Sequence, residues 1–186
     1  IERPQVQAVL VKTTPSLYFY VEKSWWEAQI PARREEILAN LEILSIEFDQ
    51  NIYPTLTSIF GSEWRPGVDG DSRITLLFHL MKEGSGGYFR SSDGYIKLQV
   101  PASNEREMLY LPVSQIDSSQ LKVFLAHEFV HLITFNQKDR IQGVQEEVWL
   151  NEARAAYSSS ILGYDSSYEG SNLQRRVKNF LEKPHD

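Results

Sequence analysis

Short apolar, β-branched segments open the chain, and a longer segment with helical periodicity follows them. Val6–Val11 and Leu17–Val21 are apolar and rich in aromatic or branched residues, which predicts two strands joined by a turn. Pro31 suits the first turn of a helix, and the apolar residues after it recur at about helical spacing. We therefore expect a helix from Pro31 to about Ile52, with a kink or break at Pro54.

The middle of the chain predicts further strands. Ile74–Met81 is a continuous apolar run between turn-rich segments, which is typical of a buried strand. Tyr88–Arg90 predicts another short strand. Met108–Val113 also has strand character, but it contains Pro112, which cannot donate a hydrogen bond to a neighbouring strand. We therefore expect Met108–Val113 at the edge of the sheet.

The last third of the chain has helical rather than strand periodicity. Helices are expected over about 118–136, 146–162 and 173–181. Strands and one helix thus precede a series of helices, an order that predicts an α+β fold with a small mixed sheet. We expect one domain over 1–186, with the sheet in about 1–118 and helices in 119–186.

Composition narrows the possible functions. Of 186 residues, 41% are hydrophobic, which is enough for a packed core, and the net charge of -6 argues against a nucleic-acid partner. No apolar run approaches the roughly 18 residues of a membrane span. There is no cysteine, so disulfides and thiolate zinc sites are excluded. Any metal site must therefore use His, Asp or Glu.

The same composition bears on location. A cysteine-free chain suits a bacterial secreted protein, although cytosolic proteins can lack Cys too. The chain also begins at Ile1 without Met, as expected of a processed product or an excised part of a longer protein. We therefore expect a secreted or cell-surface location.

The strongest chemical signal is the segment His127-Glu128-Phe129-Val130-His131, which lies within a predicted helix. Histidines four residues apart share one helical face, so both imidazoles can reach one metal ion. Glu128 lies beside them and can contact a metal-bound water. The surrounding residues are almost all apolar, so this helix should be buried, where these polar groups would be costly unless paired or bound. The alternative is a pair of hydrogen-bonded core histidines.

A catalytic zinc site usually has three protein ligands and an open position for water. Glu152 lies 21 residues after His131, a gap that allows one helix to end and a second to return beside it. The small residues Ala153, Ala155 and Ala156 would let the two helices pack closely around an ion. The alternative is that Glu152 is an ordinary surface carboxylate. The metzincin pattern does not apply, because no third His follows at the required short spacing.

These motifs resemble a known group. The segment His127–His131 followed by Asn151-Glu152 resembles the gluzincin metallopeptidases, the lineage of thermolysin and the M-one-type aminopeptidases. The string Trp149–Tyr157 is particularly similar to the aminopeptidase version. Upstream, Gly67–Gly70 and Gly87–Phe89 are among the segments that resemble bacterial hyicolysin-like peptidases.

The resemblance implies a zincin-like catalytic core and a zinc-dependent endopeptidase activity. It implies that Zn²⁺ is bound by His127, His131 and Glu152, and that Glu128 is the general base for attack of the zinc-activated water on a peptide bond. The peptide or protein substrate would lie extended along an edge strand. The candidate substrate-binding residues are Met108, Leu109 and Tyr110.

Two features depart from the family pattern. In thermolysin-like members a carboxylate one turn after the ligand Glu supports the first His, and here that position is Ala156. The family also supplies a transition-state His or Tyr from beyond the second helix; Tyr157 is the candidate here, with Tyr164 and Tyr168 nearby. The alternative function is therefore a non-catalytic, zinc-stabilised module of a larger surface or adhesive protein. Glu128 favours the enzyme, because a structural zinc site does not need a base.

Overall fold

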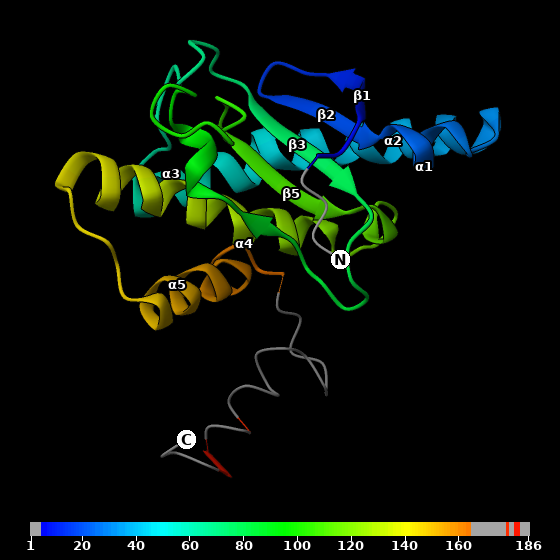
Figure 1. Cartoon of the computed structure of the whole chain (residues 1–186). Coiled ribbons are helices and arrows are strands. Elements are labelled where there is room, and N and C mark those ends of the chain that lie inside the picture. Colours follow the sequence, from blue (N-terminus) through cyan, green and yellow to red (C-terminus); the bar gives the residue numbers. More distant parts are fainter. Residues whose placement is uncertain (1–4, 165–177, 179–180, 183–186) are drawn as a thin grey trace.

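The computed structural model describes residues 5–164, 178 and 181–182 (Figure 1). In these residues five strands form one mixed sheet in the order β1-β2-β3-β5-β4. The strands are β1 Ala8–Thr13, β2 Leu17–Glu22, β3 Ile74–His79, β4 Tyr88–Phe89 and β5 Met108–Pro112. The predicted α+β fold with a small mixed sheet is confirmed.

Both parallel and antiparallel pairs occur in the sheet. β1 and β2 form an antiparallel hairpin, which is closed by the N–H of Leu17 donating to Oγ1 of Thr14 at 3.1 Å. β3 is parallel to both of its neighbours, β2 and β5, whereas β4 is antiparallel to β5. A parallel pair needs a crossover connection, and the helices between β2 and β3 supply it.

The edge of the sheet differs from the prediction. β4 (Tyr88–Phe89) pairs with Leu109 and Tyr110, so β4 forms the edge and β5 lies between β3 and β4. The expectation that Met108–Val113 is an edge strand is therefore wrong. Pro112 is the last residue of β5, beyond the two residues that pair with β4, so its missing N–H does not interrupt that pairing.

The helices in the described residues are α1 Lys23–Glu27, α2 Pro31–Glu47, α3 Tyr53–Phe60, α4 Leu121–Thr134 and α5 Val148–Ile161. Three of the predicted helices are present as α2, α4 and α5, whereas α1 and α3 were not predicted. Short 3₁₀ turns occur at Ser91–Gly94 and Val113–Gln115. The predicted helix over about 173–181 falls largely outside the described residues. No helix in the described part of the chain is long and apolar enough to cross a membrane.

Two π-helical turns lengthen these helices. Phe48–Ile52 joins α2 to α3, so the helix that begins at Pro31 continues past the predicted break. Pro54 lacks an N–H, and in an α-helix its ring would collide with the carbonyl of Gln50. The wider π turn directly before Pro54 relieves this collision. A second π turn, Phe135–Arg140, extends α4.

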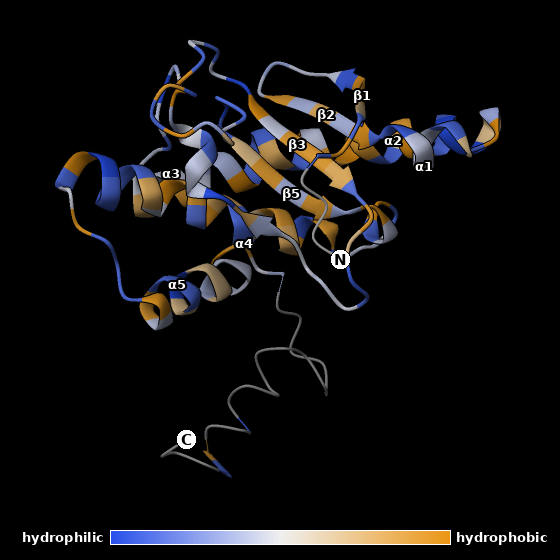
Figure 2. Cartoon of the chain, viewed as in Figure 1, coloured by the Kyte–Doolittle hydropathy of each residue, from blue (hydrophilic) through white to orange (hydrophobic). Residues whose placement is uncertain are grey.

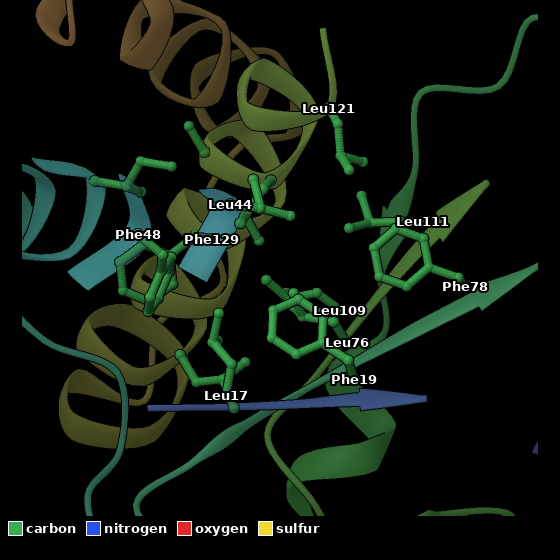
Figure 3. Packing of buried hydrophobic residues seen from close by; sticks show 14 of the residues in the cluster. Leu17, Phe19, Leu44, Phe48, Leu76, Phe78, Leu109, Leu111, Leu121 and Phe129 are labelled. Atoms are coloured by element: carbon green, nitrogen blue, oxygen red, sulfur yellow. The ribbon is translucent and has the colours of Figure 1, made fainter. Parts of the chain in front are cut away.

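The core lies between one face of the sheet and the layer of α2, α3 and α4 (Figure 3). Apolar residues are concentrated in the central strands and in α4 (Figure 2). Phe129 of α4 packs edge-on against Phe48, with ring centroids 5.2 Å apart, and both side chains are fully buried. The other buried side chains that Figure 3 labels are Leu17, Phe19, Leu44, Leu76, Phe78, Leu109, Leu111 and Leu121. This packing fixes α4 against the sheet.

The helix α5 lies outside the two layers that enclose the core. It packs along α4 and lies beyond the layer of α2, α3 and α4 (Figure 1). Its buried residues Ala155, Ser158 and Ser159 are all small, so the two helices can approach closely. The close approach of α4 and α5 creates the site described next.

Candidate metal centre

Three side chains from two helices converge on one point. The Nε2 atoms of His127 and His131, one turn apart on α4, are 3.2 Å from each other. Glu152 on α5 brings one carboxylate oxygen to 3.4 Å from each of these atoms, Oε2 toward His127 and Oε1 toward His131. The structure therefore brings together the three residues that the sequence pattern proposes as ligands.

The spacing of these donor atoms fits a zinc ion. Zinc takes imidazole nitrogen and carboxylate oxygen ligands at about 2.0–2.2 Å in a tetrahedral arrangement, which puts neighbouring ligand atoms about 3.3 Å apart. The two imidazole nitrogens are 3.2 Å apart, and each lies 3.4 Å from a different oxygen of the Glu152 carboxylate. Within the residues that the structure describes, this is also the one cluster of three His, Asp or Glu side chains suited to a metal ion.

Asn151 orients one of the histidines. Its Oδ1 lies 3.0 Å from Nδ1 of His131. An amide oxygen only accepts hydrogen bonds, so this contact places the proton of His131 on Nδ1 and leaves the lone pair of Nε2 free for a metal. The sequence pattern identified the Asn-Glu pair but assigned Asn151 no role. Its position next to the ligand Glu152 was the signal available.

Glu128 adjoins His127 in the sequence but is not a member of the three-residue cluster. It is buried on α4. Burial raises the pKa of Glu128 to about 8, and the negative charge of Glu152 adds to this effect. A cation held by the cluster would act in the opposite direction, because it favours the ionised carboxylate.

The edge strand passes close to Glu128 because the residue before it is a glycine. A Cβ atom on Gly87 would lie 2.8 Å from the carbonyl oxygen of Tyr110 and 3.1 Å from Oε1 of Glu128. Gly87 also has φ +146°, a conformation that other residues rarely adopt. The sequence analysis named Gly87 only as part of a segment that resembles hyicolysin-like peptidases, and it did not predict this close approach. A glycine beside a strand was the available signal.

The three candidate substrate-binding residues lie next to the edge strand and not on the edge. Met108, Leu109 and Tyr110 are all buried, and β4 covers the outer side of β5. The Tyr110 hydroxyl donates to Oδ2 of Asp93 at 2.5 Å. The backbone edge left open beside α4 therefore belongs to β4.

The three tyrosines proposed as transition-state donors are found in three different situations. Tyr157 is 61% exposed and lies five residues after Glu152, which is about 140° around the helix. Its predicted role therefore remains a prediction. Tyr164 donates its hydroxyl to Oε1 of Glu47 at 2.5 Å and is thus engaged in another contact. Tyr168 lies outside the described residues.

Fold and site together define a class of protein. A mixed α+β fold that carries a His–His–Glu cluster on two adjacent helices is consistent with a zincin-like core. Such a cluster, with a buried carboxylate beside it, is typical of metallopeptidases.

Comparison with known proteins leads to the same class. Over 129 residues the chain is 34% identical to the neutral metalloprotease ShpI of Staphylococcus hyicus, a match that covers 60% of this chain and 28% of the relative. The chain thus spans less than a third of the length of that relative. No model of a protein family matches the chain. The similarity and the cluster together support a relationship to metallopeptidases and a bound metal ion.

Proposed function

We propose that this chain is a zinc-dependent endopeptidase of the gluzincin type, in which His127, His131 and Glu152 bind Zn²⁺ and Glu128 is the general base. The observation that carries the proposal is the convergence of two imidazole nitrogens and the Glu152 carboxylate, at separations of 3.2–3.4 Å, beside a buried glutamate. The similarity to a neutral metalloprotease supports the same activity.

Each residue of the proposed site has its own part in the reaction. A zinc ion bound there would polarise the substrate carbonyl and make a water molecule acidic. Glu128 takes the proton of the attacking water and returns it to the leaving amine. Asn151 holds His131 in the tautomer that leaves Nε2 free to bind.

The substrate is proposed to be a peptide or protein segment in extended conformation. Such a segment can add a strand to the open edge of β4, which runs antiparallel to β5. Gly87 directly precedes β4 and packs against Glu128, so a peptide on this edge would pass next to the base. A secreted or cell-surface location suits this activity and the cysteine-free composition.

Replacing the base tests the proposal. Glu128→Gln keeps the shape of the side chain but removes its basicity, so zinc content and folding should survive. Hydrolysis of casein or of a quenched peptide should fall at least about a hundredfold. Glu147→Gln is the matched control, because Glu147 is an exposed residue at the N-terminus of α5 and its replacement should leave hydrolysis unchanged.

The same assay separates the enzyme from the zinc-stabilised module. Wild-type cleavage must disappear with a chelator and return with zinc. If the Glu128→Gln variant cleaves as fast as wild type, Glu128 is not the base. If the wild type binds zinc but cleaves no member of a broad peptide library, the site is structural and the enzyme proposal is wrong.

A further inference from the structure

The half of α5 that carries the third ligand has little apolar packing. The buried residues of α5, Ala155, Ser158 and Ser159, all follow the ligand, whereas none of the residues 148–154 is fully buried. Glu152 itself is 55% exposed. Because helices are normally held in place by a buried apolar face, this half of α5 needs another means of fixation.

A bidentate ion pair supplies this fixation. Glu146 lies in the connection before α5, and Arg154 lies on α5 two residues after the ligand. Nη2 of Arg154 is 2.9 Å from Oε1 of Glu146, and Nη1 contacts Oε2. The Glu146 side chain is 7% exposed and that of Arg154 is 23% exposed. Both charges are therefore largely withdrawn from water and hold each other in a defined geometry.

The pair is placed where it can control the approach of α5 to α4. Arg154 lies three residues after Asn151 and four before the buried Ser158, so it shares the helix face that turns toward α4. On the other side, burial and the negative charge of Glu146 raise the pKa of Asp139 in the π turn that extends α4. The N–H of Val144 also donates to the carbonyl of Lys138 in this π turn at 3.1 Å, so the connection that carries Glu146 is held to the end of α4 as well as to α5.

We propose that Glu146 and Arg154 are positioning residues, which fix the first half of α5 so that the carboxylate of Glu152 reaches the two histidines. This inference rests on the zinc site proposed above. Neither residue is a ligand, yet loss of the pair should weaken zinc binding. An ion pair that only stabilised the fold would have no such specific effect.

A pair of substitutions separates positioning from stability. Arg154→Gln leaves Glu146 buried, without its partner and close to Asp139, which should lower the melting temperature of the metal-free protein. The double variant Glu146→Gln/Arg154→Gln removes both charges, so this melting temperature should recover. Zinc affinity, measured by competition with a chromophoric chelator, should be at least about tenfold weaker in both variants.

A second ion pair provides the control. Arg73 binds Asp71 at the start of β3, together with the hydroxyl of Tyr18 and the carbonyl of Thr14. Arg73→Gln should lower the melting temperature and leave zinc affinity unchanged. Arg154→Lys keeps the charge but loses the bidentate geometry, so its zinc affinity should lie between those of wild type and Arg154→Gln.

The outcomes are distinct. Zinc affinity in the double variant within about twofold of wild type would overturn the positioning role and leave a stabilising ion pair only. Equal losses of zinc affinity in Arg73→Gln and Arg154→Gln would overturn it too, because the effect would then follow general stability. A wild-type chain that binds no zinc would overturn the metal centre itself, and the positioning role with it.

Discussion

Glu107 should make the stability of this protein depend on pH. The side chain is 5% exposed; Oε1 accepts the N–H of Val68 at 3.2 Å, and Oε2 has no hydrogen-bond partner within the described residues. Burial raises the pKa of Glu107 from 4.5 to about 7. The positive charge of Arg140 acts against this shift, and the negative charge of Asp69 acts with it.

The sign and size of the effect follow from this shift. Between pH 4.5 and 7 the folded protein keeps the proton that the unfolded chain has lost, so the contribution is full below pH 4.5 and is lost as the pH rises through 7. A shift of about 2.5 units corresponds to about 3 kcal/mol at most. Glu107→Gln cannot ionise, so the stability of this variant does not fall in this way as the pH rises.

Thermal unfolding of the metal-free protein at pH 5 and pH 8 measures the effect. The advantage of Glu107→Gln over wild type should grow between these pH values by up to about 2.5 kcal/mol, or roughly 5–10 °C in melting temperature. Glu83→Gln, at an exposed loop position, is the control and should show no such growth. A difference between Glu107→Gln and wild type that is the same at both pH values would refute the reasoning.

Three further predictions concern the site. Zinc at about a thousand times its dissociation constant should stabilise the folded protein by about 4 kcal/mol. Removing it with a chelator should therefore lower the melting temperature by roughly 10 °C, and added zinc should restore it. Gly87→Ala should cost about 2 kcal/mol or more in urea unfolding and should reduce kcat/KM, because its Cβ would collide with the carbonyl of Tyr110. Ala156→Glu should tighten zinc binding by about 10–100-fold in chelator competition. Equal affinity would show that another group already orients His127.

Local signals in the sequence were sufficient for most of the fold. The strands at Leu17 and Ile74 and the helix at Pro31 were predicted correctly, because apolar periodicity and turn residues act over a few neighbours. The order of strands is not local. Pro112 suggested that β5 lies at the edge of the sheet, but the short strand β4, Tyr88–Phe89, forms that edge instead. The pairing of β4 with β5 joins segments that are separated in the sequence, so it leaves no periodic signal in either segment.

In the candidate site, too, local features were predictable and most contacts between elements were not. The two histidines were identified because a spacing of four residues places them on one face of a helix, whatever the rest of the fold. The convergence of Glu152 with them rested on motif spacing, and the structure places its carboxylate beside both imidazoles. The contacts of Asn151 and Gly87 were not predicted, because each depends on the distance between elements that only tertiary packing defines.

α5 shows why periodicity alone could not orient the ligand-bearing helix. Trp149, Ala153 and Tyr157 lie four residues apart on one face, and an apolar stripe of this kind is normally buried. Here all three are exposed, while Asn151 contacts His131 of α4 and Arg154 contacts Glu146. The orientation of α5 therefore follows the polar contacts of Asn151, Arg154 and Glu152, and not the apolar stripe of the helix.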